Sequence, residues 1–252
     1  GYTLRCFQNH DIESILALPD DPKTIVAWDT DSEEPITRFQ HLRIFRTSLR
    51  RSAKQDNECA LPAHLNYSFS SYFTHNNTAP LVPAPLHARP TVGFCGNASH
   101  AARQRLNAAF VNDPRVDAFI YDTRTFIKAH TNKQPMFERY LATMHACPFI
   151  LCCRGTGNWS IRFYETLCAG RIPVLLDTDV VLPKEDTIDG DSVIIKDVNA
   201  STLVQKVVAW HGRGPAFLVA AQRRCFDIWY TQLRAEVFFA HALSPPSLAP
   251  HN

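Results

Sequence analysis

The chain has 252 residues, of which 45% are hydrophobic and 20% are charged, a composition typical of a soluble globular protein rather than a disordered one. Its net charge of +2 is too small to indicate a nucleic acid or an anionic membrane as a partner. No apolar run approaches the ~20 residues that a membrane-spanning helix needs. We therefore expect no membrane span in this chain, and no signal peptide is evident at its start.

The first third of the sequence predicts a small parallel sheet. Residues 3–6, 24–28 and 42–47 have the pattern of strands, residues 11–18 that of a helix, and residues 57–62 that of a loop. Asp29 and Asp31 directly follow the second strand, and ligands of open α/β sheets gather at the carboxyl ends of strands. The aromatic-rich residues 67–73 have two interpretations, since they either present rings to an acceptor sugar or pack a small core.

Residues 80–90 hold four prolines and predict a stiff linker between two domains. We place a first Rossmann-like domain at residues 1–88 and a second at 89–215. Strands are expected at 90–95 and 116–121, and helices at 101–110, 133–145 and 201–210. One long amphipathic helix is expected over residues 216–241, followed by a flexible tail at 244–252.

The most informative stretch runs from residue 148 to residue 183 and predicts a strand–loop–helix–strand unit. Residues 149–153 form a short apolar run typical of a buried strand. The loop that follows holds Gly155 and Gly157, which tolerate backbone conformations that other residues resist. Ser160 is expected to cap the next helix, which Gly170 ends.

The loop and the start of this helix indicate an anion site. Backbone N–H groups and the positive end of the helix dipole favour an anion there, and Arg154 and Arg162 add fixed positive charge. Glu165, one turn into the helix, is placed to accept from the vicinal hydroxyls of a ribose. This local pattern fits a nucleotide-diphosphate site, but it fits equally a capped core helix whose Arg162 and Glu165 make surface pairs.

A resemblance supports the first interpretation. The string RGTGNWSIRFYETLCAGRIPVLLDTDVVLP at residues 154–183 closely resembles the signature of the exostosin-like glycosyltransferases of family 47. The segments IFRTSLRRS at 44–52 and VGFCGNAS at 92–99 are also similar to this family. The resemblance implies a GT-B fold of two Rossmann-like domains facing a cleft, with residues 216–243 packing back on the first domain.

The same resemblance implies inverting transfer of a sugar from a UDP-sugar to a glycan acceptor, with no metal and no other cofactor. Xylose is the first expectation for the donor sugar, by resemblance alone. Short chains of this kind are similar to enzymes of large algal viruses. We expect the diphosphate and ribose to contact the following residues: Arg46, Asn97, Arg103, Arg154, Gly155, Gly157, Asn158, Ser160, Arg162 and Glu165. Arg105 is an alternative to Arg103.

The catalytic base is expected on the first domain, where Asp29 and Asp31 fit best and His41 fits less well. Their alternative role is to cap a turn after a strand. Two other functions remain open. Asp177 and Asp179 form a DxD pattern, which would hold a divalent metal in a GT-A-like transferase. The chain is alternatively an inactive partner or scaffold of an active transferase.

Cysteine placement bears on the compartment. Most of the eight cysteines fall in elements that we expect to be buried, where they act as small hydrophobes and favour a reducing compartment. Of five glycosylation sequons, those at Asn97 and Asn158 lie in the expected donor loops, where a glycan would block binding. We therefore expect a cytoplasmic protein, in the host cytosol if it is viral. The alternative is the Golgi lumen, with a membrane anchor removed.

Overall fold

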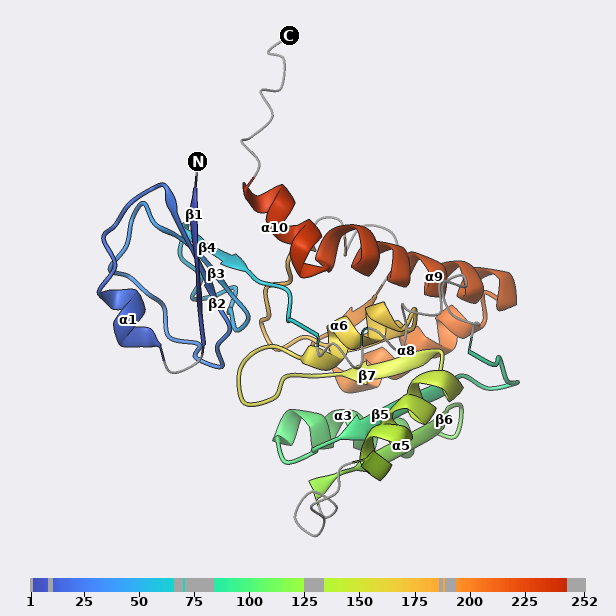
Figure 1. Ribbon diagram of the computed structural model, residues 1–252. Coiled ribbons are helices and arrows are strands. Elements are labelled where there is room, and N and C mark those ends of the chain that lie inside the picture. The colour runs from blue at the N-terminus through green and yellow to red at the C-terminus, as the bar shows by residue number, and fades with distance from the viewer. Residues whose placement is uncertain are drawn as a thin grey trace.

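The computed structural model describes residues 2–8, 11–65, 70, 84–124, 134–185, 188 and 194–243. These residues form two α/β domains, each built on one parallel sheet, and the C-terminal helices run from the second domain back to the first (Figure 1). Residues 67–73 lie outside the described residues except for residue 70, as do residues 80–83 of the expected linker and the tail from residue 244.

The first domain is a four-stranded parallel sheet. Its elements are β1 (Thr3–Phe7), α1 (Ile12–Leu16), β2 (Thr24–Trp28), β3 (Arg43–Arg46) and β4 (Glu58–Ala60). The strands lie in chain order, β1-β2-β3-β4. The sheet therefore has no point at which the strand order reverses, and it lacks the crevice that such a reversal provides.

Strand β4 corrects our prediction of a loop over residues 57–62. Its Glu58 is fully buried and accepts a 2.8 Å hydrogen bond from Nη1 of Arg46 on the neighbouring strand. A charged residue at the start of a three-residue strand has no apolar signature. Because the counter-ion of Glu58 lies on β3, the sequence of residues 58–60 alone does not show that they form a buried strand.

The second domain is a doubly wound sheet. Its strands are β5 (Thr91–Gly96), β6 (Asp117–Asp122), β7 (Phe149–Cys152), β8 (Ile172–Leu176) and β9 (Ile195–Asp197). Their order is β6-β5-β7-β8-β9, and all neighbours are parallel. The chain leaves β5 in one direction and β7 in the other, so the loops after these two strands flank a topological switch point.

Helices cover this sheet. They are α3 (Ala101–Val111), α5 (Gln134–Ala146), α6 (Ile161–Cys168), α8 (Ala200–His211) and α9 (Pro215–Ile228). Helix α3 packs against α8, whereas α6 packs against α9. All residues of β7 and β8 are buried, which is why both strands are apolar along their whole length.

The two domains are joined by a short antiparallel contact. The backbone N–H of Arg51 donates to the carbonyl of Asp179 (2.9 Å), and that of Val181 donates to the carbonyl of Leu49 (3.0 Å). Ser52 adds a backbone hydrogen bond of 3.1 Å to the Asp179 carboxylate. The loop after β3 and the loop after β8 therefore hold the domains together on one side.

The expected single helix over residues 216–241 is interrupted. Helix α9 ends at Ile228, a π-helical turn follows at Trp229–Leu233, and Arg234 is extended before α10 (Ala235–Leu243) begins. Among the described residues, those of α10 pack against the first sheet (Figure 1). The break redirects the chain so that the apolar side of α10 meets the first sheet.

Helix α10 covers one face of the first sheet through a small aromatic cluster. Phe238 is 4% exposed and meets Phe45 of β3 edge to face, with ring centroids 5.7 Å apart. Ile25 and Ala27 of β2 and Leu61 belong to the same cluster. The last helix thus completes a core that the first 65 residues begin.

Phe238→Ala tests this contribution. We expect it to lower the free energy of unfolding by about 3 kcal/mol, because it leaves a cavity between α10 and the first sheet. Urea denaturation followed by circular dichroism measures the change. The control Val219→Ala truncates a residue of α9 that is 40% exposed, and it should change stability little. Equal effects of the two substitutions would contradict the role of α10.

Candidate active site

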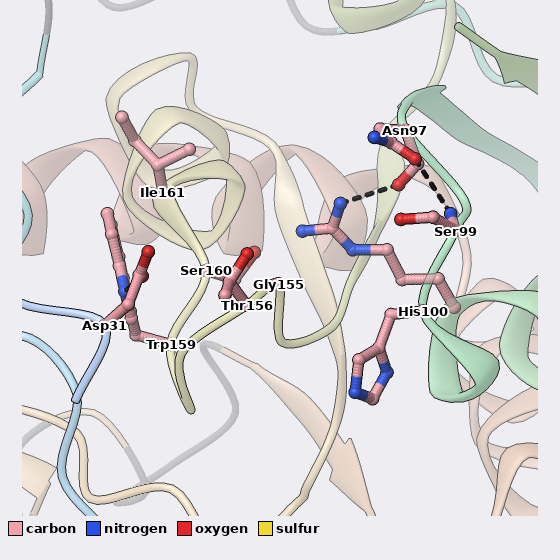
Figure 2. A pocket seen from close by; sticks show the side chains of 10 residues that line it. Asp31, Asn97, Ser99, His100, Gly155, Thr156, Trp159, Ser160 and Ile161 are labelled. Carbon is pink, nitrogen blue, oxygen red and sulfur yellow. Dashed lines mark hydrogen bonds between the residues drawn. The ribbon is translucent and has the colours of Figure 1, made fainter. Parts of the chain in front are cut away.

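A cleft of about 550 Å³ opens at the carboxyl ends of β5 and β7, at the switch point of the second sheet (Figure 2). The loop after β5, the loop after β7, the first turns of α3 and α6 and one residue of the first domain form its walls. Its lining residues are Asp31, Asn97, Ser99, His100, Arg103, Gly155, Thr156, Trp159, Ser160 and Ile161.

Arg103 of α3 connects the two loops of the switch point. Its Nη1 donates to the carbonyl of Asn97 (2.7 Å), and its Nε donates to the carbonyl of Arg154 (2.9 Å). A Cβ at Gly155 would lie only 3.1 Å from Nη2 of Arg103, so the glycine leaves room for the guanidinium. Burial lowers the pKa of the Arg103 guanidinium. Because the ordinary pKa of arginine lies far above neutral pH, the group still carries its charge at neutral pH.

The amino end of α6 faces the cleft. Ser160 is the N-cap residue of the helix, as expected, and is 6% exposed, but its side chain makes no capping hydrogen bond. Its Oγ has no hydrogen-bond partner among the described residues. Gly170 ends the helix with a φ of 54°, as predicted. A buried, unpartnered hydroxyl beside a helix amino terminus is a ready set of donors for an anion.

The first domain contributes Asp31 to the mouth of the cleft. The indole N–H of Trp159 donates to Oδ1 of Asp31 at 2.7 Å, and Figure 2 shows the two side chains next to each other. Gly157 packs under this contact, because a Cβ there would lie 2.7 Å from Cα of Asp31. The carboxylate is thus held at the junction of the two domains.

The other candidate bases lie elsewhere. Asp29 does not line the cleft, and its Oδ1 accepts from Oγ1 of Thr47 at 3.3 Å. His41 is exposed outside the cleft, and its backbone N–H donates to Asp20. Of the three candidates, the structure brings only Asp31 to the cleft.

Arg154 and Asn158 join the signature loop to the first domain instead of lining the cleft. The guanidinium of Arg154 forms an ion pair with Glu33, and Nη2 also donates to the carbonyl of Thr156 at 3.0 Å. Asn158 is fully buried, and its backbone N–H donates to Oγ of Ser48 at 2.9 Å. Both residues fix the shape of the loop from behind.

Arg162 and Glu165 of α6 lie beside the cleft, at the end of β5. Nη2 of the buried Arg162 donates to the carbonyl of Cys95 at 2.5 Å, and the guanidinium lies over the ring of Phe94 at 4.6 Å. Gly96 makes this possible, since a Cβ there would overlap the guanidinium. Glu165 accepts a hydrogen bond from the hydroxyl of Tyr140.

The electrostatics of Glu165 combine opposing effects. Burial raises the pKa of its carboxyl above the ordinary value, whereas the Tyr140 hydrogen bond and the Arg162 charge act to lower it. The net result is a raised pKa, so Glu165 takes up a proton at a higher pH than an exposed glutamate does.

Arg46, expected to reach the donor from the first domain, does not line the cleft. It is fully buried, pairs with Glu58, and donates to the carbonyl of Glu34 at 2.8 Å. Its guanidinium also lies 5.0 Å from the centre of the Trp28 ring. These contacts keep the side chain inside the first domain, although its buried Nε has no hydrogen-bond partner among the described residues.

Asp177 and Asp179 have structural partners. Oδ1 of Asp177 accepts the backbone N–H groups of Asp179 (2.9 Å) and Val180 (3.2 Å). The Asp179 carboxylate accepts from Ser52 across the domain junction. In the described ranges, no three His, Cys, Asp or Glu side chains come together as a metal would require. Nor is any helix in these ranges both long and apolar enough to cross a bilayer.

Several cleft residues escaped the sequence analysis. Thr156, Trp159 and Ile161 lie inside the recognised string, so a closer reading of it would include them. His100 directly follows the loop at residues 96–99 and starts a helix, and that position was a usable signal. Arg105, the alternative to Arg103, lines a separate pocket.

Two parallel α/β domains, with a cleft at the switch point of the second, define a GT-B-type fold. Residues 64–207 match the Exostosin GT47 domain, which is more than half of the chain. The protein therefore belongs to the exostosin GT47 family. The crystal structure of a glycosyltransferase from Rickettsia africae is similar in fold, with a TM-score of 0.51 and 11% identity over 88% of this chain and 69% of that one.

Curated relatives match a shorter stretch. A probable glucuronosyltransferase, GUT1, from Oryza sativa subsp. japonica is 30% identical over 91 residues, which is 33% of this chain and 22% of that protein. The probable beta-1,4-xylosyltransferase IRX10 from Arabidopsis thaliana is 29% identical over 89 residues, which is 32% of this chain and 22% of that protein. The match thus spans about a fifth of the length of these relatives.

Gly157→Ala tests the domain junction. The new methyl group would collide with the backbone of Asp31, and we expect a loss of about 1–3 kcal/mol in the free energy of unfolding. Tryptophan fluorescence should change as Trp159 separates from Asp31. Gly212→Ala is the control, since the nearest atoms to its Cβ lie at 3.5 Å, an ordinary contact. A Gly157→Ala protein as stable as the control would contradict this close packing.

Proposed function

We propose that the protein is an inverting glycosyltransferase that moves a sugar from a UDP-sugar to a hydroxyl group of a glycan acceptor. The observation that carries this proposal is the convergence of Arg103, the amino end of α6 and Asp31 on one cleft between two domains. The first two provide positive potential and hydrogen-bond donors, and the third provides a base on the opposite wall.

The leaving diphosphate needs neutralisation in the transition state. Arg103 brings a half-buried positive charge, and the amino end of α6 brings the helix dipole and the unpartnered Ser160 hydroxyl. These groups are held in place before the donor arrives, so they cost little reorganisation during the reaction. Groups of these types can stabilise the negative charge of the diphosphate without a metal ion, and we propose that no metal ion is required.

Asp31 is our candidate for the catalytic base. The acceptor hydroxyl would pass its proton to the carboxylate as its oxygen forms a bond to the anomeric carbon, and the bond from that carbon to the diphosphate would break. One displacement of this kind inverts the anomeric centre. The Trp159 hydrogen bond would hold the carboxylate in position while the acceptor enters from the side of the first domain.

Glu165 is our candidate for the ribose contact, with Tyr140 orienting its carboxylate. The names of the relatives, a probable glucuronosyltransferase and a probable xylosyltransferase, support glucuronic acid or xylose as the sugar of the donor. Xylose remains our first choice. All eight cysteines are free thiols, and Asn158 is fully buried where no glycan can attach. Both observations favour a cytosolic home over the Golgi lumen.

A panel of UDP-sugars tested by calorimetry, with and without EDTA, examines the donor directly. We expect one UDP-sugar to bind with the same affinity in both conditions, because the cationic groups of the cleft replace a metal. Affinity that EDTA abolishes and Mn²⁺ restores would favour the metal-dependent alternative. Binding of UDP without any transfer or hydrolysis would favour the scaffold alternative.

Asp31→Asn should reduce transfer by about 100-fold or more while donor affinity stays normal, because an amide cannot accept the proton. Single-turnover assays with the UDP-sugar found above measure the transfer step. Asp29→Asn is the matched control, because Asp29 lies two residues before Asp31 and does not line the cleft. Full transfer activity in the Asp31→Asn protein would remove Asp31 from the mechanism.

Glu165→Gln should weaken UDP binding roughly tenfold, since the ribose hydroxyls would lose an ionised acceptor. In the wild-type protein, affinity should fall with decreasing pH as the carboxyl takes up a proton. Because its pKa is raised, this loss should begin at a higher pH than for an ordinary glutamate. Calorimetric titrations across the pH range should find this dependence abolished in Glu165→Gln. An unchanged pH profile would contradict the ribose contact.

A further inference from the structure

We propose that His100 binds a phosphate oxygen of the donor through its Nε2–H group. This inference rests on the proposed function and adds a binding residue to that site. His100 lines the cleft together with Arg103 and Ser160, at the first turn of α3 (Figure 2). It therefore lies where the diphosphate would bind if the amino end of α6 and Arg103 hold it.

The tautomer of the imidazole follows from a local hydrogen bond. His100 is the N-cap residue of α3, and its Nδ1 accepts the backbone N–H of Ala102 at 3.2 Å. A ring nitrogen that accepts a hydrogen bond carries no proton, so the proton of the neutral ring is on Nε2. Nε2 has no partner in the part of the chain that the structure describes. The helix cap thus presents an N–H donor to the cleft.

The charges around His100 keep the ring neutral. Burial and the nearby guanidinium groups of Arg154, Arg103 and Arg105 lower the pKa of the imidazole, and the carboxylate of Glu33 opposes them only in part. At neutral pH the ring therefore acts as an uncharged donor among cations. Phosphate oxygens accept hydrogen bonds and are drawn to such a cationic region, which makes phosphate the fitting partner.

The same hydrogen bond argues against a role for His100 as the base. Its only basic nitrogen is Nδ1, which already accepts the Ala102 N–H. Taking a proton there would break the cap at the start of α3. This leaves proton transfer to Asp31 and assigns His100 to binding.

Two substitutions of His100 distinguish the role of Nδ1 from the role of Nε2. His100→Asn keeps an acceptor for the Ala102 N–H, because asparagine is a favoured N-cap residue, but it has no group at the position of Nε2. His100→Gln places an amide N–H near the position of Nε2 but lacks the short capping geometry. The pair therefore distinguishes phosphate binding from helix capping.

We expect His100→Asn to bind UDP roughly 10- to 100-fold more weakly than the wild type, as for loss of a hydrogen bond to a charged group, and to bind uridine equally well. His100→Gln should recover part of the UDP affinity while lowering the melting temperature. Calorimetry with UDP, the chosen UDP-sugar and uridine, together with thermal denaturation, measures these effects.

A second measurement needs no variant. Nitrogen-15 NMR of the wild-type histidines should show His100 protonated on Nε2, and UDP should shift that resonance whereas uridine should not. A ring protonated on Nδ1, or an Nε2 signal unmoved by UDP, would overturn the inference.

Other results would overturn it as well. Unchanged UDP affinity in His100→Asn would reduce His100 to a helix cap. An equal loss for UDP and uridine would indicate a structural effect, and a loss for the UDP-sugar alone would transfer the contact from the phosphate to the sugar. If the wild-type protein binds neither UDP nor any UDP-sugar, the proposed function fails first and this inference fails with it.

Discussion

The hydrogen bonds of Arg103 are the constraint on which the cleft depends. One guanidinium holds the carbonyl of Asn97 after β5 and the carbonyl of Arg154 after β7. The two strands are paired in the sheet, but the chain leaves them in opposite directions, so the loops that follow them diverge. A planar group with five donors suits this task, because it bonds both loops at defined angles and keeps its charge.

The signature loop has two sides with different tasks. Ser160 and Gly155 face the cleft, whereas Arg154 and Asn158 face the first domain. The Arg154 side chain, which the sequence pattern assigns to ligand binding, here pairs with Glu33, and the backbone N–H of Asn158 donates to Ser48 while its side-chain oxygen accepts from Thr178. The shape of the cleft thus depends on the domain junction, since the loop is held by contacts on its reverse side.

A feature of this structure could be predicted from the sequence where its pattern lies within a few neighbouring residues. The strand–loop–helix–strand unit around Ser160 was predictable, because its apolar runs and glycines act within a few residues. The buried pair of Arg46 and Glu58 was not, because each residue reads as polar surface until its partner on another strand is known. Asp31 was singled out by its place after β2, but its hydrogen bond with Trp159 joins residues 128 positions apart, and no local pattern predicts that pairing. His100 was overlooked although it stands at a helix start.

The aromatic contact between α10 and the first sheet has a consequence for synthesis of the chain. Domains generally fold as units while the polypeptide emerges, amino-terminal part first. Here the face of β2 and β3 that carries Ile25 and Phe45 is covered by Phe238, which is made almost 200 residues later. The first domain therefore waits for the end of the chain to complete its core, while the second domain already has all of its strands. In the growing polypeptide, the domain that is synthesised first is therefore the last to receive all the residues of its core.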